Sequence, residues 1–135
     1  MRKPLLLLML VALVLVPPAN ADVGIVLTTL VVHRCGWIRG VGDGSGLPVY
    51  LVPNRFAPRR EGPAEPRSKQ PPRPPFILLG RLRRTSDPYA NQRFRFRVPR
   101  VHLGRYRVFL YCRACGGSLI VSGISFEGQT LRIVR

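Results

Sequence analysis

The segment from Arg93 to Val98 alternates strictly between arginine and an apolar residue. Successive side chains of a β-strand point to opposite faces. This period of two therefore predicts a strand with Phe94, Phe96 and Val98 on one face and arginines on the other. Such a strand is half-buried, which directs the chain toward a β architecture with a sheet covering a hydrophobic core.

Six other segments have the alternating or β-branched composition that is typical of strands, and no segment has a helical period. In chain order, the seven predicted strands are Val23–Val32, Leu47–Val52, Phe76–Leu82, Arg93–Val98, Arg105–Tyr111, Ser118–Val121 and Thr130–Val134. Glycine and proline separate them, and the glycine-rich segment Gly40–Gly46 is predicted to be a turn. The pattern predicts an all-β fold, a single antiparallel β-sandwich of about seven strands, with a small barrel as the alternative.

Residues 1–21 have the three parts of a secretory signal peptide. Arg2 and Lys3 supply a positive start, Leu5–Val16 is an unbroken apolar run, and Ala19-Asn20-Ala21 places small residues where a signal peptidase cleaves. The apolar run is too short for a membrane span, which needs about 20 residues. We therefore expect cleavage after Ala21 and a secreted or extracytoplasmic domain over residues 22–135, peripheral at most to a membrane.

The chain is strongly basic, with 22 lysines and arginines against 6 aspartates and glutamates and a formal net charge of +16. The predicted leader holds two of the basic residues and no acidic one, so the exported domain stays cationic. This charge predicts adhesion to an anionic cell-envelope polymer, to lipid head groups or to a protein partner. Nucleic acid would bind in a test tube, but export makes it an unexpected natural partner.

A proline-rich basic segment separates the second and third predicted strands. Residues 53–75 hold eight prolines, six basic residues and two glutamates. This composition supplies neither a core strand nor a helix, so we predict an exposed loop that is partly in the polyproline-II conformation. A tolerated insertion and a binding loop are both open interpretations.

A second alternating segment, Arg105–Tyr111, follows the first and directs Tyr106, Val108 and Leu110 inward. Only Pro99–Gly104 connects the two segments, which predicts neighbouring antiparallel strands in a hairpin. If both inward sets face one core, five arginines gather on one sheet face, which is either solvated or bound to an anion. The predicted anion- or partner-binding residues are therefore Arg93, Arg95, Arg97, Arg105 and Arg107.

The stretch from Phe94 to Val108 resembles the F-x-V-P-x-(x)n-G-x-Y-x-V segment of exported bacterial β-sandwich modules, such as transthyretin-like and carboxypeptidase-regulatory-like domains. In such modules a strand ends at the proline, here Pro99. A glycine then makes the turn and a tyrosine opens the next strand, which match Gly104 and Tyr106. The continuation to Cys115 is similar to small secreted β-sandwich proteins of GC-rich bacteria. The resemblance implies a non-catalytic extracellular module, Ig-like or transthyretin-like, and supplies no ligand.

The three cysteines leave two interpretations open. Cys112-x-x-Cys115 in an exported protein predicts a local disulfide, with Cys35 buried, free or paired between chains. Thiol–disulfide exchange is disfavoured because no helix N-terminus activates Cys112. The alternative is a Cys3His zinc site formed by His33, Cys35, Cys112 and Cys115, with copper as a weaker variant.

No catalytic motif accompanies the two histidines, His33 and His102, and the six acidic residues lie mostly in predicted turns and loops. We therefore expect no enzyme activity and no cofactor. The sequence predicts an exported, non-catalytic β-sandwich protein that interacts through a basic surface with an anionic envelope component or a partner protein. An extracytoplasmic metal-binding protein is the alternative function.

Overall fold

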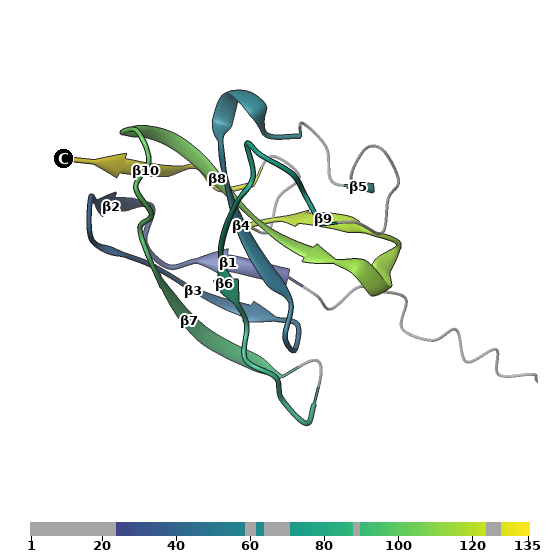
Figure 1. Cartoon of the computed structure of the whole chain (residues 1–135). Coiled ribbons are helices and arrows are strands. Elements are labelled where there is room, and N and C mark those ends of the chain that lie inside the picture. The colour runs from purple at the N-terminus through teal and green to yellow at the C-terminus, as the bar shows by residue number, and fades with distance from the viewer. Residues whose placement is uncertain (1–23, 59–61, 64–70, 88–89, 124–127) are drawn as a thin grey trace, which may run out of the picture.

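The computed structural model describes residues 24–58, 62–63, 71–87, 90–123 and 128–135, and in these it contains strands and two 3-10 turns but no α-helix (Figure 1). The strands are β1 (Gly24–Leu27), β2 (Val31–His33), β3 (Trp37–Asp43), β4 (Pro48–Pro53), β5 (Gly62–Pro63), β6 (Ile77–Arg81), β7 (Asn91–Arg97), β8 (Gly104–Cys112), β9 (Ser118–Val121) and β10 (Leu131–Val134). The 3-10 turns are η1 (Asn54–Phe56) and η2 (Arg113–Cys115). The predicted all-β class is confirmed. The predicted leader lies outside the described residues.

The strands form two sheets. The smaller sheet has the order β1–β3–β7, and the larger sheet has the order β2–β10–β8–β4–β6. The last four residues of β8 pair with β9, which also pairs with the two-residue strand β5. Neighbouring strands are antiparallel except β2 and β10, which are parallel. The residues that the structure describes form ten strand segments in curled sheets, more than the seven or so that the sequence predicts.

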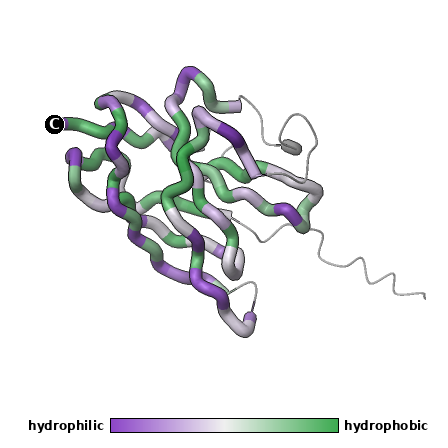
Figure 2. The backbone as a smooth tube through the Cα atoms, in the orientation of Figure 1, coloured by the Kyte–Doolittle hydropathy of each residue, from purple (hydrophilic) through white to green (hydrophobic). Residues whose placement is uncertain are grey.

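One hydrophobic core lies between the two sheets. Ile25 and Ile38 enter it from the smaller sheet, and Leu51, Val108 and Leu131 enter it from the larger sheet. The inward sets predicted from alternation are correct: Tyr106, Val108 and Leu110 are buried, and Phe94 and Phe96 pack against this core. Figure 2 shows the alternation as bands of hydrophilic and hydrophobic colour along β7. Each sheet therefore turns one face to the core and the other outward.

The predicted turn at Gly40–Gly46 is wrong in its first half, because Trp37–Asp43 forms β3, the central strand of the smaller sheet. The glycine at position 40 serves close packing. A Cβ atom there would lie 2.4 Å from Cζ of Phe94 and 2.5 Å from the carbonyl oxygen of Val26. A phenylalanine ring packed over a strand glycine stabilises the pair of strands. The chain turns only after β3, around Gly46, which has a φ of 73°.

The predicted strand Val23–Val32 is two strands in two sheets. β1 pairs with β3, whereas β2 pairs with β10 in the larger sheet. Two backbone hydrogen bonds fix the crossing: Thr28 N–H donates to Arg39 in the smaller sheet, and Arg132 N–H donates to Leu30 in the larger. Composition predicts the strand character of this segment but not the point at which it changes sheets.

A second hydrophobic cluster lies on the outer face of the larger sheet, over β4, β9 and the end of β8. Phe109 is almost fully buried there, and the ring of Phe76 packs edge-on against the rings of Tyr50 and Phe109, with centroids 6.4 Å and 6.0 Å away. The cluster consists of Tyr50, Val52, Phe109, Tyr111, Leu119 and Val121, with Ala57 and Phe76 packed against it. Ala57 in the proline-rich segment and Phe76 directly after it therefore contact this face, whereas residues 59–61 and 64–70 of that segment lie outside the described residues.

Candidate anion-binding surface

The predicted hairpin between Arg93–Val98 and Arg105–Tyr111 is wrong. β7 pairs with β3 in the smaller sheet, whereas β8 pairs with β4, β9 and β10 in the larger sheet. The connection after Arg97 crosses from one sheet to the other, so the two inward sets face the same core from opposite sides. The five predicted arginines therefore separate into two groups on opposite outer faces.

Arg93, Arg95 and Arg97 share the outer face of the smaller sheet with a fourth arginine, Arg39. The register places Arg39 directly opposite Arg95, and Trp37 directly opposite Arg97. We call this surface, formed by Trp37, Arg39, Arg93, Arg95 and Arg97, the arginine face. Arg39 was missed because its neighbouring glycines predicted a turn. The alternation of Trp37, Ile38 and Arg39 was the signal for a strand there.

Two of these arginines stack on Trp37. The guanidinium carbons of Arg95 and Arg97 lie 4.7 Å and 4.6 Å from the centre of the indole ring. Arg97 also donates a hydrogen bond of 2.7 Å from Nη1 to the carbonyl oxygen of Cys35. Stacking uses the face of a guanidinium and leaves N–H groups at its edge, which bind carboxylate or phosphate oxygens. The stacked arrangement therefore leaves hydrogen-bond donors of both guanidinium groups available to an anion.

The arginine face is open, and in the described part of the chain its four arginines outnumber the single acid on that face, Asp43. A depression of about 560 Å³ lies beside Arg39, Arg93 and Arg95, with Thr28 and Val41 in its lining. Asp43 lies on the same face at the far end of β3, and the only other acid in the described chain is Asp87. No ion pair joins the four arginines to either carboxylate. A positive surface of this kind attracts an external anion, because like charges placed directly opposite each other repel.

The remaining predicted arginines, Arg105 and Arg107, lie on the outer face of the larger sheet. Arg107 donates a hydrogen bond of 2.8 Å from Nε to Oδ1 of Asn54, at the start of η1. Arg105 is opposite Arg132 of β10. This second basic group has different neighbours from the arginine face and no aromatic ring stacked on it in the described chain.

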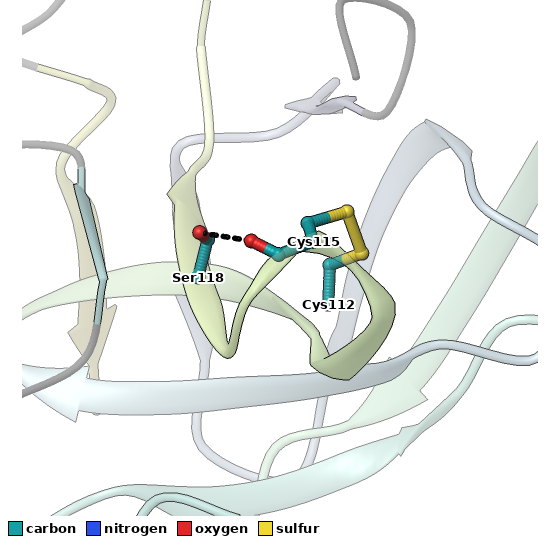
Figure 3. The surroundings of a disulfide bond; sticks show 3 residues. All are labelled: Cys112, Cys115 and Ser118. Carbon is teal, nitrogen blue, oxygen red and sulfur yellow. Dashed lines mark hydrogen bonds between the residues drawn. A yellow bond between two sulfur atoms is a disulfide. The ribbon is translucent and has the colours of Figure 1, made fainter. Parts of the chain in front are cut away.

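The predicted disulfide is confirmed: Cys112 and Cys115 are linked, with their Cα atoms 5.2 Å apart (Figure 3). The bond closes the turn η2 between β8 and β9, and Ser118 Oγ donates a hydrogen bond of 2.7 Å to the carbonyl oxygen of Cys115. Gly116 continues the turn in a left-handed conformation, with a φ of 78°, that other residues rarely adopt. The cysteine pair therefore belongs to the scaffold.

The structure does not bring together the four residues of the alternative Cys3His metal site. His33 and the exposed thiol Cys35 lie at the β2–β3 turn, which adjoins the Gly104 end of β8 through β10. Cys112 is at the other end of β8, about 26 Å away at the rise of an extended strand, and its sulfur is bonded to Cys115. Nowhere in the described part of the chain do three or more histidine, cysteine or acidic side chains gather around a metal-sized space.

Comparison of the chain with protein-family models, with curated proteins and with solved structures gives no match. Among the described residues, no helix is long and apolar enough to cross a membrane.

Proposed function

We propose that this protein is an exported, non-catalytic β-sandwich module that binds an anionic polymer of the cell envelope through the arginine face. One observation carries the proposal. Four arginines lie on one open sheet face, two of them stacked on Trp37, and none pairs with a carboxylate in the described chain.

Export is supported by the composition of residues 1–21 and is consistent with the Cys112–Cys115 bond. Disulfides persist in oxidising compartments and are rare in the cytosol. The polymers that such a domain meets carry phosphate, carboxylate or sulfate groups, all of which accept hydrogen bonds from guanidinium.

The sandwich assignment, Ig-like or transthyretin-like, is part of this proposal. The order β1–β3–β7 corresponds to A–B–E of an immunoglobulin-like sandwich, and β10–β8–β4 corresponds to G–F–C. The Tyr106 hydroxyl donates to the carbonyl oxygen of His102 four residues upstream, at the corner between sheets, as the tyrosine corner of such folds does. Burial raises the pKa of Tyr106, against a smaller lowering by Arg55, so this phenol stays protonated and able to donate.

An extended polymer fits this surface better than a small anion. Alternate residues of β7 are spaced by about 7 Å along the strand, so Arg93, Arg95 and Arg97 form a row with Arg39 beside it. A chain with repeated charges engages several of these arginines at once, and each further contact forms at a high effective concentration. A single small anion would contact only one or two of these arginines.

The test uses two matched pairs of directly opposed arginines. Arg39→Gln/Arg95→Gln removes two charges from the arginine face, and Arg105→Gln/Arg132→Gln removes two from the larger sheet. With long-chain polyphosphate, dextran sulfate and polyglutamate as probes in calorimetric titration, we expect the first pair to lose roughly tenfold or more in affinity, since hydrogen bonds to charged groups contribute about 1.5–3 kcal/mol each.

The second pair should keep most of the affinity for these polymers. Equal losses in the two variants would mean that net charge alone drives binding, which would overturn the assignment of the arginine face.

A further inference from the structure

The outer face of the larger sheet carries a second surface of different chemistry, at the end where β8 begins. Val31 of β2, Arg132 of β10 and Arg105 of β8 are direct neighbours in register across three strands. Leu30 precedes Val31, and its carbonyl oxygen accepts the hydrogen bond from Arg132 N–H. We call the surface formed by Leu30, Val31, Leu103, Arg105, Arg132 and Arg135 the amphipathic end.

Exposed aliphatic side chains are concentrated at this end. Leu30, Val31 and Leu103 have exposed fractions of 43%, 49% and 39%, and they are half of the exposed large hydrophobic residues in the described chain. Leu103 and the arginines at positions 105, 132 and 135 line one shallow depression of about 360 Å³. A single exposed leucine is ordinary, but a cluster bordered by charge marks a contact surface.

Arg105 and Arg132 of this end have no acidic neighbour in the ranges that the structure describes. Arg105 and Arg132 face each other directly, and neither forms an ion pair with an acidic residue that the structure describes. The surface therefore offers cationic groups and aliphatic side chains side by side. A hydrophilic polyanion would satisfy the first group only and would leave Val31 and Leu103 in water.

We propose that the amphipathic end binds the surface of an anionic lipid bilayer. Lipid phosphates accept hydrogen bonds from the arginines, and the boundary between head groups and acyl chains accepts Leu30, Val31 and Leu103. This binding is independent of the proposed polymer function, because it uses the other sheet. η1 adjoins β8 through the Asn54–Arg107 hydrogen bond and carries the exposed Phe56.

Binding through the amphipathic end would fix how the protein is oriented on the membrane. The outer faces of the two sheets lie on opposite sides of a shared core, so one flat surface cannot contact both. A molecule bound to a bilayer through the amphipathic end therefore turns its arginine face away from the membrane. In that orientation, a polymer bound as proposed above lies on the side of the protein that faces away from the lipid.

The test is co-sedimentation of residues 22–135 with phosphatidylcholine vesicles, with and without phosphatidylglycerol. We expect binding only to the phosphatidylglycerol vesicles. Arg105→Gln/Arg132→Gln should weaken it strongly, because each arginine near an anionic surface contributes roughly fivefold to partitioning. Val31→Ser/Leu103→Ser should also weaken it, whereas Leu78→Ser, which removes an aliphatic residue of 52% exposure from β6, should not.

Four outcomes would overturn the inference, of which three are unchanged binding of Val31→Ser/Leu103→Ser, losses in Arg39→Gln/Arg95→Gln equal to those in Arg105→Gln/Arg132→Gln, and competition by soluble glycerol phosphate. The first two would show that charge alone attracts the protein, and the third would show a free-phosphate site. The fourth is a dimer that depends on Val31 and does not bind vesicles, which would assign the surface to a second copy of the chain. Thermal unfolding of each variant separates a lost contact from a lost fold.

Discussion

The two outer faces of the molecule start from similar sequence patterns and become different surfaces. β7 and β8 both alternate arginine with apolar residues, and both direct the apolar residues into one core. On the smaller sheet, the neighbouring strand β3 adds an indole ring and a fourth arginine, Trp37 and Arg39, so that four guanidinium groups lie on one face. On the larger sheet, β10 and β2 add Arg132 and Val31, which mix charge with aliphatic surface. The neighbouring strands therefore decide what an arginine row can bind.

The larger sheet also changes character along β8. Arg105 is exposed and Arg107 half-buried, but Phe109 and Tyr111, which point to the same outer side, are buried under Phe76 and Ala57. The smaller sheet has no such cover on its outer face in the described chain. A side chain that points to the outer side of β8 is therefore exposed to solvent near the start of the strand and buried in the second hydrophobic cluster near its end.

The largest effect is expected at this boundary on β8. Phe109→Ala should lower the free energy of unfolding by about 3–5 kcal/mol, because it removes a ring that contacts Phe76 and leaves a cavity. Arg105→Ala, four residues earlier on the same side, should change it by about 0.5 kcal/mol or less. Urea denaturation measures both. If Phe109→Ala lowers the free energy of unfolding as little as Arg105→Ala does, the outer cluster is not a packed core.

The next largest effect is expected at Gly40, a glycine of β3 that lies in the same sheet as the arginine face. Gly40→Ala places a methyl group against Phe94 and the Val26 carbonyl, so we expect a loss of about 1–3 kcal/mol and weaker polyphosphate binding as β7 shifts. Gly24→Ala is the matched control, since no heavy atom lies within 4 Å of its added Cβ. If Gly40→Ala is as stable as wild type, β3 does not pack as described.

Removing the disulfide should act on stability alone. Cys112→Ser/Cys115→Ser opens a loop of only a few residues, for which the chain-entropy relation gives about 2 kcal/mol. Polymer and vesicle binding should both persist, because neither surface contains the pair. Thermal unfolding with and without reductant measures the first effect. Loss of either binding activity would place the cysteines in a functional site.

The smallest effect is expected for Trp37→Ala, which should change binding to the arginine face but not binding to the amphipathic end. Trp37→Ala removes the ring on which Arg95 and Arg97 stack, and each stacking contact at an exposed site contributes about 0.5–1 kcal/mol. We expect a severalfold loss of affinity for polyphosphate, a steeper loss in variants that also lack Arg97, and no change in vesicle binding. Unchanged polymer affinity would mean that the stacking does not order the arginines for binding.

Local pattern predicted much of this structure. Alternation identified the inward residues of β7 and β8, and the Cys112-x-x-Cys115 spacing identified the disulfide. Both features depend on residues close together in the chain.

The errors concern contacts between distant segments. Alternation predicts that Phe94 and Tyr106 face a core, but it does not predict which sheet each strand belongs to. The short connection between the two strands therefore predicted a hairpin, whereas the chain crosses there from one sheet to the other. Gly40 predicted a turn because the ring that covers it belongs to Phe94, 54 positions later. Arg39 was missed for the same reason.

The most direct test of the arginine face is chemical-shift mapping during titration with polyphosphate. Trp37 is the only tryptophan, so its indole N–H is a unique reporter beside Arg95 and Arg97. We expect the largest shifts at that N–H, at the arginine Nε–H groups of positions 39 and 95, and along β3 and β7. Shifts that are largest at Arg105 and Arg132, or equal on both outer faces, would contradict the account.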